Sequence, residues 1–294
     1  MSTSSGTAES ELRAAVVGLG SHFDHHVAET TRAIYRNHLD LRPAAIERVD
    51  LHYGLHHRHR VDLYAPDQPR AVVIFVHGGG FVAGDKNADG SFYVNVGRWL
   101  ARRGFAALLP NYRLAPGDRW PAGARDVGDV IAQADSLLAA AGLGPQPVFV
   151  FGQSAGASHV ASWLLDAEAR GTPSRAPVAG VLLMSGFYQL DAPLPPGPRA
   201  YFGDDDAMYP AMSPLSHATD PGVPLWMSVA ELDPSWIASQ TYAMASALAK
   251  RCSVGPCFHW YEGHNHVSTV QSLGSPQTDA GAPILAFIER ALAR

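Results

Sequence analysis

Cysteine is scarce in this sequence, with only Cys252 and Cys257 among 294 residues. Two cysteines cannot hold together a chain of this length, so the fold has to rest on a hydrophobic core. We interpret both as free thiols of a cytoplasmic protein, because little else in the sequence indicates an oxidising compartment. A disulfide between Cys252 and Cys257 is the alternative.

The sequence also lacks long hydrophobic runs and blocks of basic residues. No apolar run approaches the roughly 18 residues that a membrane helix needs. The polar start, residues 1–7, shows no apolar segment of a secretory signal. The net charge is −5 and no basic block stands out, so nucleic acid is not an expected partner, and we expect no membrane span. The oligomeric state is left open, with a homodimer as one option.

Hydrophobic residues make up 47% of the chain and follow alternating strand-like and helix-like patterns. Eight short segments predict strands, at residues 48–53, 60–64, 71–76, 105–109, 148–151, 178–184, 225–230 and 257–261. Helical patterns lie at residues 10–39 with a break at 18–20, 91–102, 122–141, 154–170, 236–251 and 277–293. The alternation predicts an α/β fold, with a mostly parallel eight-stranded sheet, helices on both faces, and antiparallel pairing in the first hairpin.

The chain divides into a catalytic domain and a small cap. We expect residues 45–294 to form the domain and residues 1–44 a helical cap segment before it. Residues 185–224 are the least regular part and are rich in proline, glycine and aspartate. We interpret them as an insertion over one end of the sheet that helps to shape a pocket, and not as a linker.

The most informative stretch is Gly152-Gln153-Ser154-Ala155-Gly156, between a predicted strand and a predicted helix. A G-x-S-x-G at such a turn is typical of a nucleophile elbow, which projects the serine hydroxyl into a cleft. The small residues on either side let the strand and the helix pack closely around it. Ser154 is therefore the candidate nucleophile.

The segment His77-Gly78-Gly79-Gly80-Phe81 directly follows the third predicted strand. Acyl transfer builds negative charge on a carbonyl oxygen, and each positioned N–H donor stabilises that charge by about 3–4 kcal/mol. Glycines let backbone amides face a ligand without a Cβ in the way. A flexible connecting loop is the alternative, but the position upstream of G-x-S-x-G favours an oxyanion-stabilising loop.

Carboxylates and histidines follow the last two predicted strands. Glu231 and Asp233 come after the seventh strand, and His264 and His266 after the eighth. Side chains at the carboxyl ends of parallel strands reach the crevice where ligands bind. An acid there orients a histidine, which moves the proton. We favour Asp233 and His266, because the order Ser154, Asp233, His266 is that of α/β-hydrolase triads. Capping of the next helix is the alternative role for Asp233.

Several other residues carry weaker signals. Phe81, Phe187 and Trp236 are the aromatics that we expect to line the substrate pocket, although most aromatics in such a chain belong to the core. The histidines between His56 and His59 lack the carboxylate or cysteine pattern of a metal site. We interpret them as a solvated hairpin turn, and we expect neither a metal nor an organic cofactor.

With these motifs in order, the chain resembles the α/β-hydrolase superfamily, and within it the hormone-sensitive-lipase-like carboxylesterases. The resemblance extends over residues 45–294 and rests on four motifs, which are His77-Gly78-Gly79-Gly80, Tyr112-Arg113-Leu114-Ala115-Pro116, Asp233-Pro234 and Gly263-x-x-His266. It implies an oxyanion hole formed by the N–H groups of Gly79, Gly80 and Ala155.

Two positions depart from that family's pattern, which usually has Asp in place of Gln153 and Phe in place of Ser268. The segment from His264 to Ser268 is also similar to kynurenine formamidases, which share the fold. We therefore expect a serine hydrolase that cleaves small-molecule carboxylic esters through an acyl-enzyme intermediate. A formamide or other amide hydrolase with the same triad is the alternative. An inactive receptor of this fold is less favoured, because it would typically lack a triad member or an oxyanion glycine.

Overall fold

The computed structural model describes residues 3–171 and 177–294. Its centre is one eight-stranded sheet in the order β1-β2-β4-β3-β5-β6-β7-β8. The strands are β1 (Ile46–His52), β2 (Arg60–Ala65), β3 (Val72–Val76), β4 (Ala106–Pro110), β5 (Val148–Gln153), β6 (Gly180–Met184), β7 (Leu225–Leu232) and β8 (Cys257–Asn265). β2 pairs antiparallel with both β1 and β4, and the remaining pairs are parallel. The predicted fold is confirmed, and the antiparallel part extends one pair beyond the hairpin.

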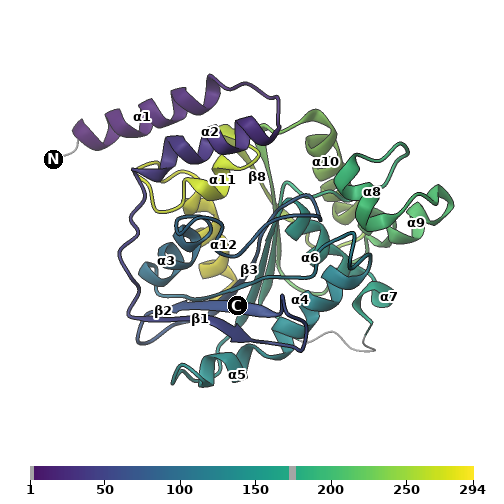
Figure 1. The fold of residues 1–294 in the computed structure, drawn as a ribbon, viewed down its shortest axis with the longest axis horizontal. Helices are drawn as coiled ribbons and strands as arrows, with labels where there is room; N and C mark the ends of the chain where they lie inside the picture. Colours follow the sequence, from purple (N-terminus) through teal and green to yellow (C-terminus); the bar gives the residue numbers. More distant parts are fainter. Residues whose placement is uncertain (1–2, 172–176) are drawn as a thin grey trace.

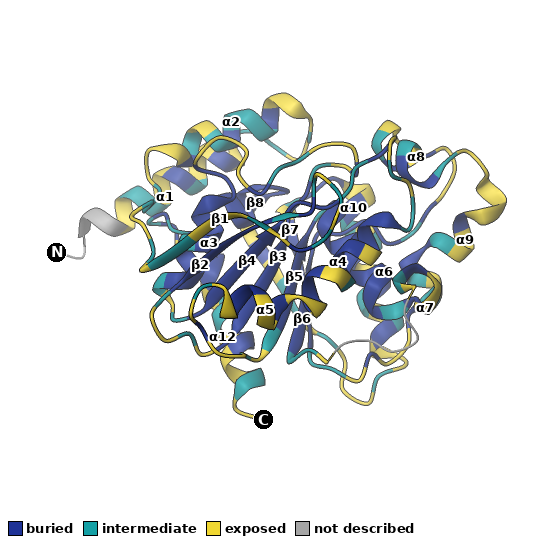
Figure 2. Cartoon of the chain, turned by 60° about the horizontal axis from the view of Figure 1, so that its bottom comes forward, coloured by how far each residue is buried: buried dark blue, intermediate teal, exposed yellow. Residues whose placement is uncertain are grey.

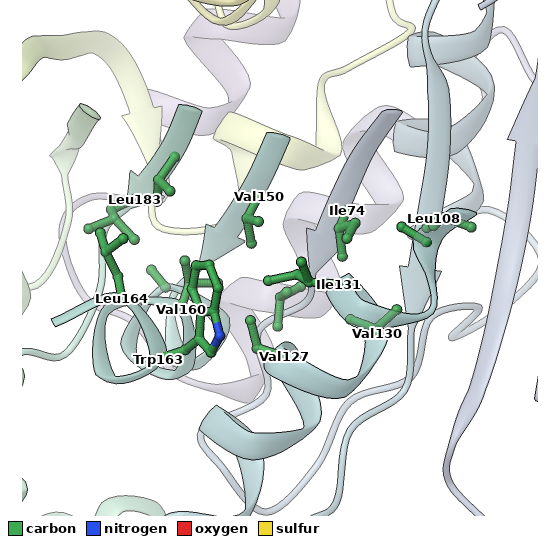
Figure 3. Packing of buried hydrophobic residues seen from close by; sticks show 14 of the residues in the cluster. Ile74, Leu108, Val127, Val130, Ile131, Val150, Val160, Trp163, Leu164 and Leu183 are labelled. Atoms are coloured by element: carbon green, nitrogen blue, oxygen red, sulfur yellow. The ribbon is translucent and has the colours of Figure 1, made fainter. Parts of the chain in front are cut away.

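Helices cover both faces of the sheet, so its central strands are buried (Figure 2). Alternate strand side chains pack against α4 (Ala122–Ala132), α6 (Ala155–Leu165) and α10 (Ser235–Ala249). The others pack against α3 (Val94–Arg102) and α12 (Gly281–Leu292). Figure 3 shows side chains of α4 and α6, such as Ile131 and Trp163, pointing toward Ile74 and Val150 of the sheet. Each such aliphatic or aromatic side chain contributes about 1.5–3 kcal/mol through burial.

Two predicted helices are each interrupted by one residue. Residues 122–141 form α4 and α5 (Ala134–Ala139), separated at Gln133. Residues 154–170 form α6 and α7 (Ala167–Arg170), because Asp166 takes an extended conformation. Its carboxylate accepts the N–H groups of Glu168 and Ala169, which caps a new helix. Periodicity alone does not reveal an aspartate that caps inside an apolar pattern.

The N-terminal helical segment folds as α1 (Thr3–Val17) and α2 (His25–Arg36). The break is wider than the predicted 18–20, because α2 begins only after Asp24, whose carboxylate accepts the Val27 N–H at 2.8 Å. α1 packs on β8, and α2 packs on α11 (Ser268–Gln271). None of the helices in residues 3–171 and 177–294 has the length and apolarity needed to cross a membrane.

Residues 185–224 contain the short helices α8 (Pro196–Phe202), η1 (Asp206–Met208), α9 (Tyr209–Met212) and η2 (Pro214–His217). They build a separate aromatic cluster, in which Phe187, Tyr201 and Phe202 pack around Phe81 of the glycine-rich loop. Figure 1 shows α8 and α9 on one side of the upper end of the molecule, and α1 and α2 on the other. Both segments therefore lie near the sheet end from which the candidate site is built.

Candidate active site

Ser154 lies in the sharp turn between β5 and α6. Its φ of 56° and ψ of −125° lie in a region that costs a residue with a side chain about 1–3 kcal/mol. A Cβ on Gly152 would lie 2.6 Å from the Ala157 Cα, and one on Gly156 would lie 2.1 Å from the Val76 carbonyl oxygen. Only glycine fits at both positions, so the G-x-S-x-G sequence forms a strand–turn–helix elbow here.

Ser154, His266 and Asp233 form one chain of hydrogen bonds, although they come from three different loops at strand ends. The Ser154 Oγ lies 2.8 Å from the His266 Nε2, and the His266 Nδ1 lies 2.6 Å from the Asp233 Oδ1. Both His266 and Asp233 are buried. A buried carboxylate bonded to Nδ1 holds the imidazole in the orientation in which its Nε2 can accept a proton from a serine hydroxyl.

Asp233 is held by two further donors. The Ser185 hydroxyl donates to its Oδ2 at 2.6 Å, and the Ala230 N–H donates to the same oxygen at 2.8 Å. Ser185 directly follows β6 and has a φ of 49°, which is uncommon for a serine. Ser185 was not among the predicted site residues. The signal that could have identified it is its hydroxyl side chain at the carboxyl end of β6. This strand lies between β5, which leads into the elbow, and β7, which leads to the acid Asp233.

The two alternative candidates lie outside this chain of bonds. Glu231 is exposed, and its carboxylate accepts the Gly263 N–H at 2.6 Å. His264 is fully buried, with Nδ1 2.9 Å from the Ser268 Oγ and Nε2 3.1 Å from the Asp279 Oδ1. Both residues therefore brace the loop that carries His266.

The N-terminal helices also hold this loop. The Asn265 side-chain amide donates to the Thr31 Oγ1 of α2 at 2.9 Å, in a fully buried contact. Arg13 of α1 donates to the carboxylate of Asp279 at 2.7 Å. Neither hydrogen bond could be predicted from the sequence, because the two residues that form each bond lie more than two hundred positions apart.

The glycine-rich loop bends back beside the elbow. Gly79 has a φ of 140°, and a Cβ there would lie 1.9 Å from the Ala83 carbonyl oxygen. Its own carbonyl accepts the Ala83 N–H at 3.0 Å. Gly79, Gly80 and Ala155 line the same cavity as Ser154. The structure thus brings the three predicted donor residues around the candidate nucleophile.

His77 supports the glycine-rich loop as a neutral side chain. Burial lowers the pKa of His77 to about 4, so the ring carries no charge near pH 7. Its Nδ1 lies 2.7 Å from the Gly78 carbonyl oxygen. The Tyr112 hydroxyl donates to the His77 carbonyl at 2.9 Å, which anchors the start of the loop to the segment after β4.

Gln153, the residue that departs from the related esterases, lies at the junction of elbow, histidine loop and glycine-rich loop. Its side-chain amide donates to the His266 carbonyl at 2.9 Å. Its Oε1 lies beside Gly78, where an added Cβ would come within 2.6 Å of it. An amide can donate to that carbonyl, whereas an ionised carboxylate cannot.

The cavity above Ser154 has a volume of about 340 Å³. Phe81, Phe187 and Trp236 line it, and Trp236 is 46% exposed at its edge. The lining also includes the residues that lead into α2, where the Phe23 ring packs edge-on against His266 at 4.7 Å between ring centres. This segment was predicted to belong to a cap, but none of its pocket residues was predicted.

The histidines of the first hairpin are not all solvated. His59 is buried, and its Nε2 lies 3.2 Å from the Asp126 Oδ1. The prediction of a solvated turn is therefore wrong for His59, because a distant carboxylate of α4 draws it into the core. Within the described ranges, no group of three or more His, Cys, Asp or Glu side chains is placed to hold a metal ion.

Comparison with known proteins agrees with this architecture. A model of the alpha/beta hydrolase fold family matches residues 73–269. The chain is 34% identical over 122 residues to the isoprenylcysteine alpha-carbonyl methylesterase ICME of Arabidopsis thaliana, covering 40% of this chain and 28% of that one. It is 38% identical over 91 residues to the esterase LipC of Mycobacterium tuberculosis, covering 31% and 22%. The chain thus spans less than a third of the length of these curated relatives.

Solved structures show the same fold over nearly the whole chain. Esterase B of Lactobacillus rhamnosis superposes with a TM-score of 0.72 at 18% identity, over 97% of this chain and 96% of that one. The esterase of the archaeon Pyrobaculum calidifontis superposes with a TM-score of 0.69 at 22% identity, over the same shares. At these identities the likeness establishes the fold, while the chemistry has to be argued from the residues of the site.

Proposed function

The chain belongs to the α/β-hydrolase family, in its hormone-sensitive-lipase-like branch, and from this premise we propose that it is a serine carboxylesterase acting on small esters. The observation that carries the proposal is the hydrogen-bonded chain from Ser154 through His266 to Asp233, which opens into a cavity also lined by Gly79 and Gly80. A nucleophile, a base, an acid and an oxyanion loop are the groups that acyl transfer requires.

The reaction proceeds in two halves. His266 accepts the Ser154 proton through Nε2 while the Ser154 Oγ bonds to the ester carbonyl carbon, and Asp233 stabilises the charged imidazole. The N–H groups of Gly79, Gly80 and Ala155 stabilise the negative carbonyl oxygen. His266 then gives its proton to the departing alkoxide oxygen, which leaves as an alcohol. Water, deprotonated by His266, attacks the acyl-enzyme and releases the carboxylic acid and free Ser154.

Residues 1–44 and 185–224 form the cap of this enzyme, with residues 45–294 as its catalytic domain. The support for the cap is that Phe23 and Phe187, one from each segment, both line the cavity that contains Ser154. Phe81, Phe187 and Trp236 bind the apolar part of the substrate. The cavity volume of about 340 Å³ and the aromatic packing around Phe81 support a preference for short acyl groups.

Turnover of p-nitrophenyl acetate by the Ser154→Ala variant tests the proposal. Loss of the nucleophile should lower kcat by at least about 10³-fold, because the oxyanion loop alone supplies only residual catalysis. Ser136→Ala, which changes an exposed serine of α5, is the matched control. A fluorophosphonate probe should label the wild type and not Ser154→Ala. Wild-type turnover by Ser154→Ala would sink the proposal, and absence of wild-type labelling would favour an inactive receptor.

A formamide hydrolase with the same residues is the second candidate. It is favoured by the segment from His264 to Ser268, which is similar to kynurenine formamidases, and by Gln153 in place of the aspartate of related esterases. Comparing kcat/KM for N-formylkynurenine with that for acetyl and butyryl esters separates the two candidates. Esters should be preferred, and a higher kcat/KM for N-formylkynurenine would replace the ester assignment.

A further inference from the structure

One wall of the catalytic cavity is helical and carries a positive charge. This helical wall consists of Phe23, Asp24, His25, Ala28 and Arg32, from α2 and the residues just before it. Ala28 and Arg32 are four residues apart, so they lie on the same face of α2. Arg32 is the only lysine or arginine among the described residues that line the cavity.

The guanidinium of Arg32 is mostly buried and only partly paired. Its side chain is 24% exposed, and its Nη1 donates to the Glu29 Oε1 at 2.7 Å. Its Nε is buried and has no hydrogen-bond partner among the described residues. A guanidinium has five N–H donors and is most stable when they are bonded. The contacts with Glu29 and with the Tyr93 hydroxyl therefore leave the Nε and part of the bonding capacity of Arg32 unused beside the cavity.

The surroundings of Arg32 leave its positive charge available to a ligand. Glu29 is 44% exposed, and an ion pair at such a position is weakened by water. The other nearby carboxylate, Asp24, is occupied by the Val27 N–H and lies 3.1 Å from His22. Tyr93 also lines the cavity, and its hydroxyl is hydrogen-bonded to the Arg32 side chain. Burial raises the pKa of Tyr93, and the Arg32 charge opposes this rise.

The helical wall lies on the side of the cavity where the alcohol leaves. Its Phe23 ring packs against His266, the group that returns a proton to the departing oxygen in the proposed reaction. Phe187 and Trp236 pack against each other elsewhere in the cavity lining. An anionic group on the leaving alcohol would therefore face Arg32, whereas an apolar acyl group would face the aromatic side.

We infer that this enzyme acts on esters whose alcohol part carries a carboxylate, and that Arg32 is the specificity residue that binds it. The inference rests on the proposed esterase activity and names its substrate class. A guanidinium binds a carboxylate through two parallel N–H···O bonds, and such a pair gains strength where water is partly excluded. Arg32 acts on the bound ester and takes no part in the bond-making steps.

The test uses a matched pair of acetate esters, 4-acetoxybenzoate and the neutral 4-acetoxybenzamide. The ratio of their kcat/KM values, carboxylate over amide, should be at least tenfold higher for the wild type than for Arg32→Gln. Dividing the ratios cancels the intrinsic reactivity of the two esters. Arg32→Lys should recover part of the preference, and added salt should lower it. Arg36→Gln is the control, because Arg36 lies one turn further along α2, pairs with Asp89 and does not line the cavity.

Equal ratios in the wild type and Arg32→Gln would overturn the inference. A second pair, p-nitrophenyl hemisuccinate and p-nitrophenyl butyrate, places the carboxylate on the acyl side. If Arg32→Gln impairs this pair selectively instead, the assignment to the leaving group is wrong. If Arg32→Gln does not fold, inhibition of the wild type decides: benzoate should compete at least tenfold more strongly than benzamide, and equal inhibition would overturn the inference.

The proposed esterase activity is judged separately in the same experiment. Turnover of 4-acetoxybenzamide that disappears in Ser154→Ala upholds the esterase even when Arg32→Gln shows no change in preference. Absence of turnover of all four esters by the wild type contradicts the proposed function itself.

Discussion

The two halves of the cavity differ in how their side chains are held. The strand-end half, with Ser154, Asp233 and His266, is largely buried, and its polar groups bond to one another and to the backbone of β7. In the helical wall, Asp24 and His25 are exposed, and the Arg32 guanidinium is only partly paired. Groups that transfer a proton have to be positioned to within fractions of an ångström, so they need to be buried and held by hydrogen bonds. Groups that recognise a substrate can be held by a helix that the sheet does not constrain.

Hydrogen bonds and a ring contact join the N-terminal segment to the strand-end half. Thr31 bonds to Asn265 next to His266, and Arg13 bonds to Asp279. Changes in the strand-end half should therefore act on kcat, and changes in the helical wall should act on substrate preference or stability. Each of the following predictions tests this division.

The largest effect is expected from Gly79→Ala. The new Cβ would lie 1.9 Å from the Ala83 carbonyl oxygen, so the loop must shift and its N–H groups must leave their positions. Loss of one oxyanion donor lowers kcat about 10²–10³-fold. Gly90→Ala is the control, because Gly90 also has a positive φ but an added Cβ there meets no atom within 4 Å. Unchanged kcat for p-nitrophenyl acetate in Gly79→Ala would show that this loop does not bind the oxyanion.

Acid should destabilise the strand-end half through its buried histidines. Burial lowers the pKa of His77 to about 4 and that of His159, beneath Phe81, to about 3. Below about pH 6.5 the unfolded chain binds protons that the folded chain rejects. The free energy of unfolding should therefore fall as the pH is lowered from 6.5 toward 4, by up to about 1.4 kcal/mol per pH unit for each histidine.

Urea unfolding at pH 7, 6 and 5 measures this slope. His159→Leu removes one of the two groups and should flatten the slope by up to about 1.4 kcal/mol per pH unit. His38→Leu, at an exposed position of the N-terminal segment, should leave the slope as it is. A slope that is the same in the wild type and His159→Leu would mean that groups elsewhere set the response to acid.

Ser185→Ala should lower kcat by a smaller factor, because it removes one of the hydrogen bonds that hold the triad acid Asp233. The variant removes a 2.6 Å hydrogen bond to the Asp233 carboxylate but leaves the bond from the Ala230 N–H. A hydrogen bond to a charged group is worth about 1.5–3 kcal/mol, so kcat should fall at least about tenfold with little change in KM. Ser228→Ala is the control, because the buried Ser228 hydroxyl has no partner in the described structure. Equal kcat values for the two variants would contradict a positioning role for Ser185.

The smallest effect on the reaction is expected from Thr31→Val, which breaks a contact between the halves. The Asn265 amide loses a buried acceptor, which should cost about 1–3 kcal/mol of unfolding free energy and lower kcat only a few-fold. Thr30→Val, at the neighbouring and less buried position, is the control for both measurements. A kcat loss above tenfold with unchanged stability would show that the helical wall takes part in the chemistry.

Much of the strand-end half could be predicted because its chemistry leaves local signatures. The elbow requires glycine two residues before and after Ser154, and the glycine-rich loop requires glycine at Gly79, since an added Cβ at these positions would clash with backbone atoms. Hydrophobic periodicity likewise indicated all eight strands. It failed at Asp166 and Asp24, where one side chain caps a helix inside a continuous pattern.

The sequence by itself therefore determined the sheet, the elbow and the order in which the nucleophile, acid and base occur. The chain order also favoured Asp233 and His266 over Glu231 and His264, which differ from them by only two positions. The tertiary structure placed the favoured pair in one chain of hydrogen bonds with Ser154. It also brought Ser185 to the acid, Thr31 to the histidine loop and Arg32 to the cavity. Such contacts join side chains that lie far apart in the sequence, so neither periodicity nor spacing predicts them. They form only when the layers of the fold pack together.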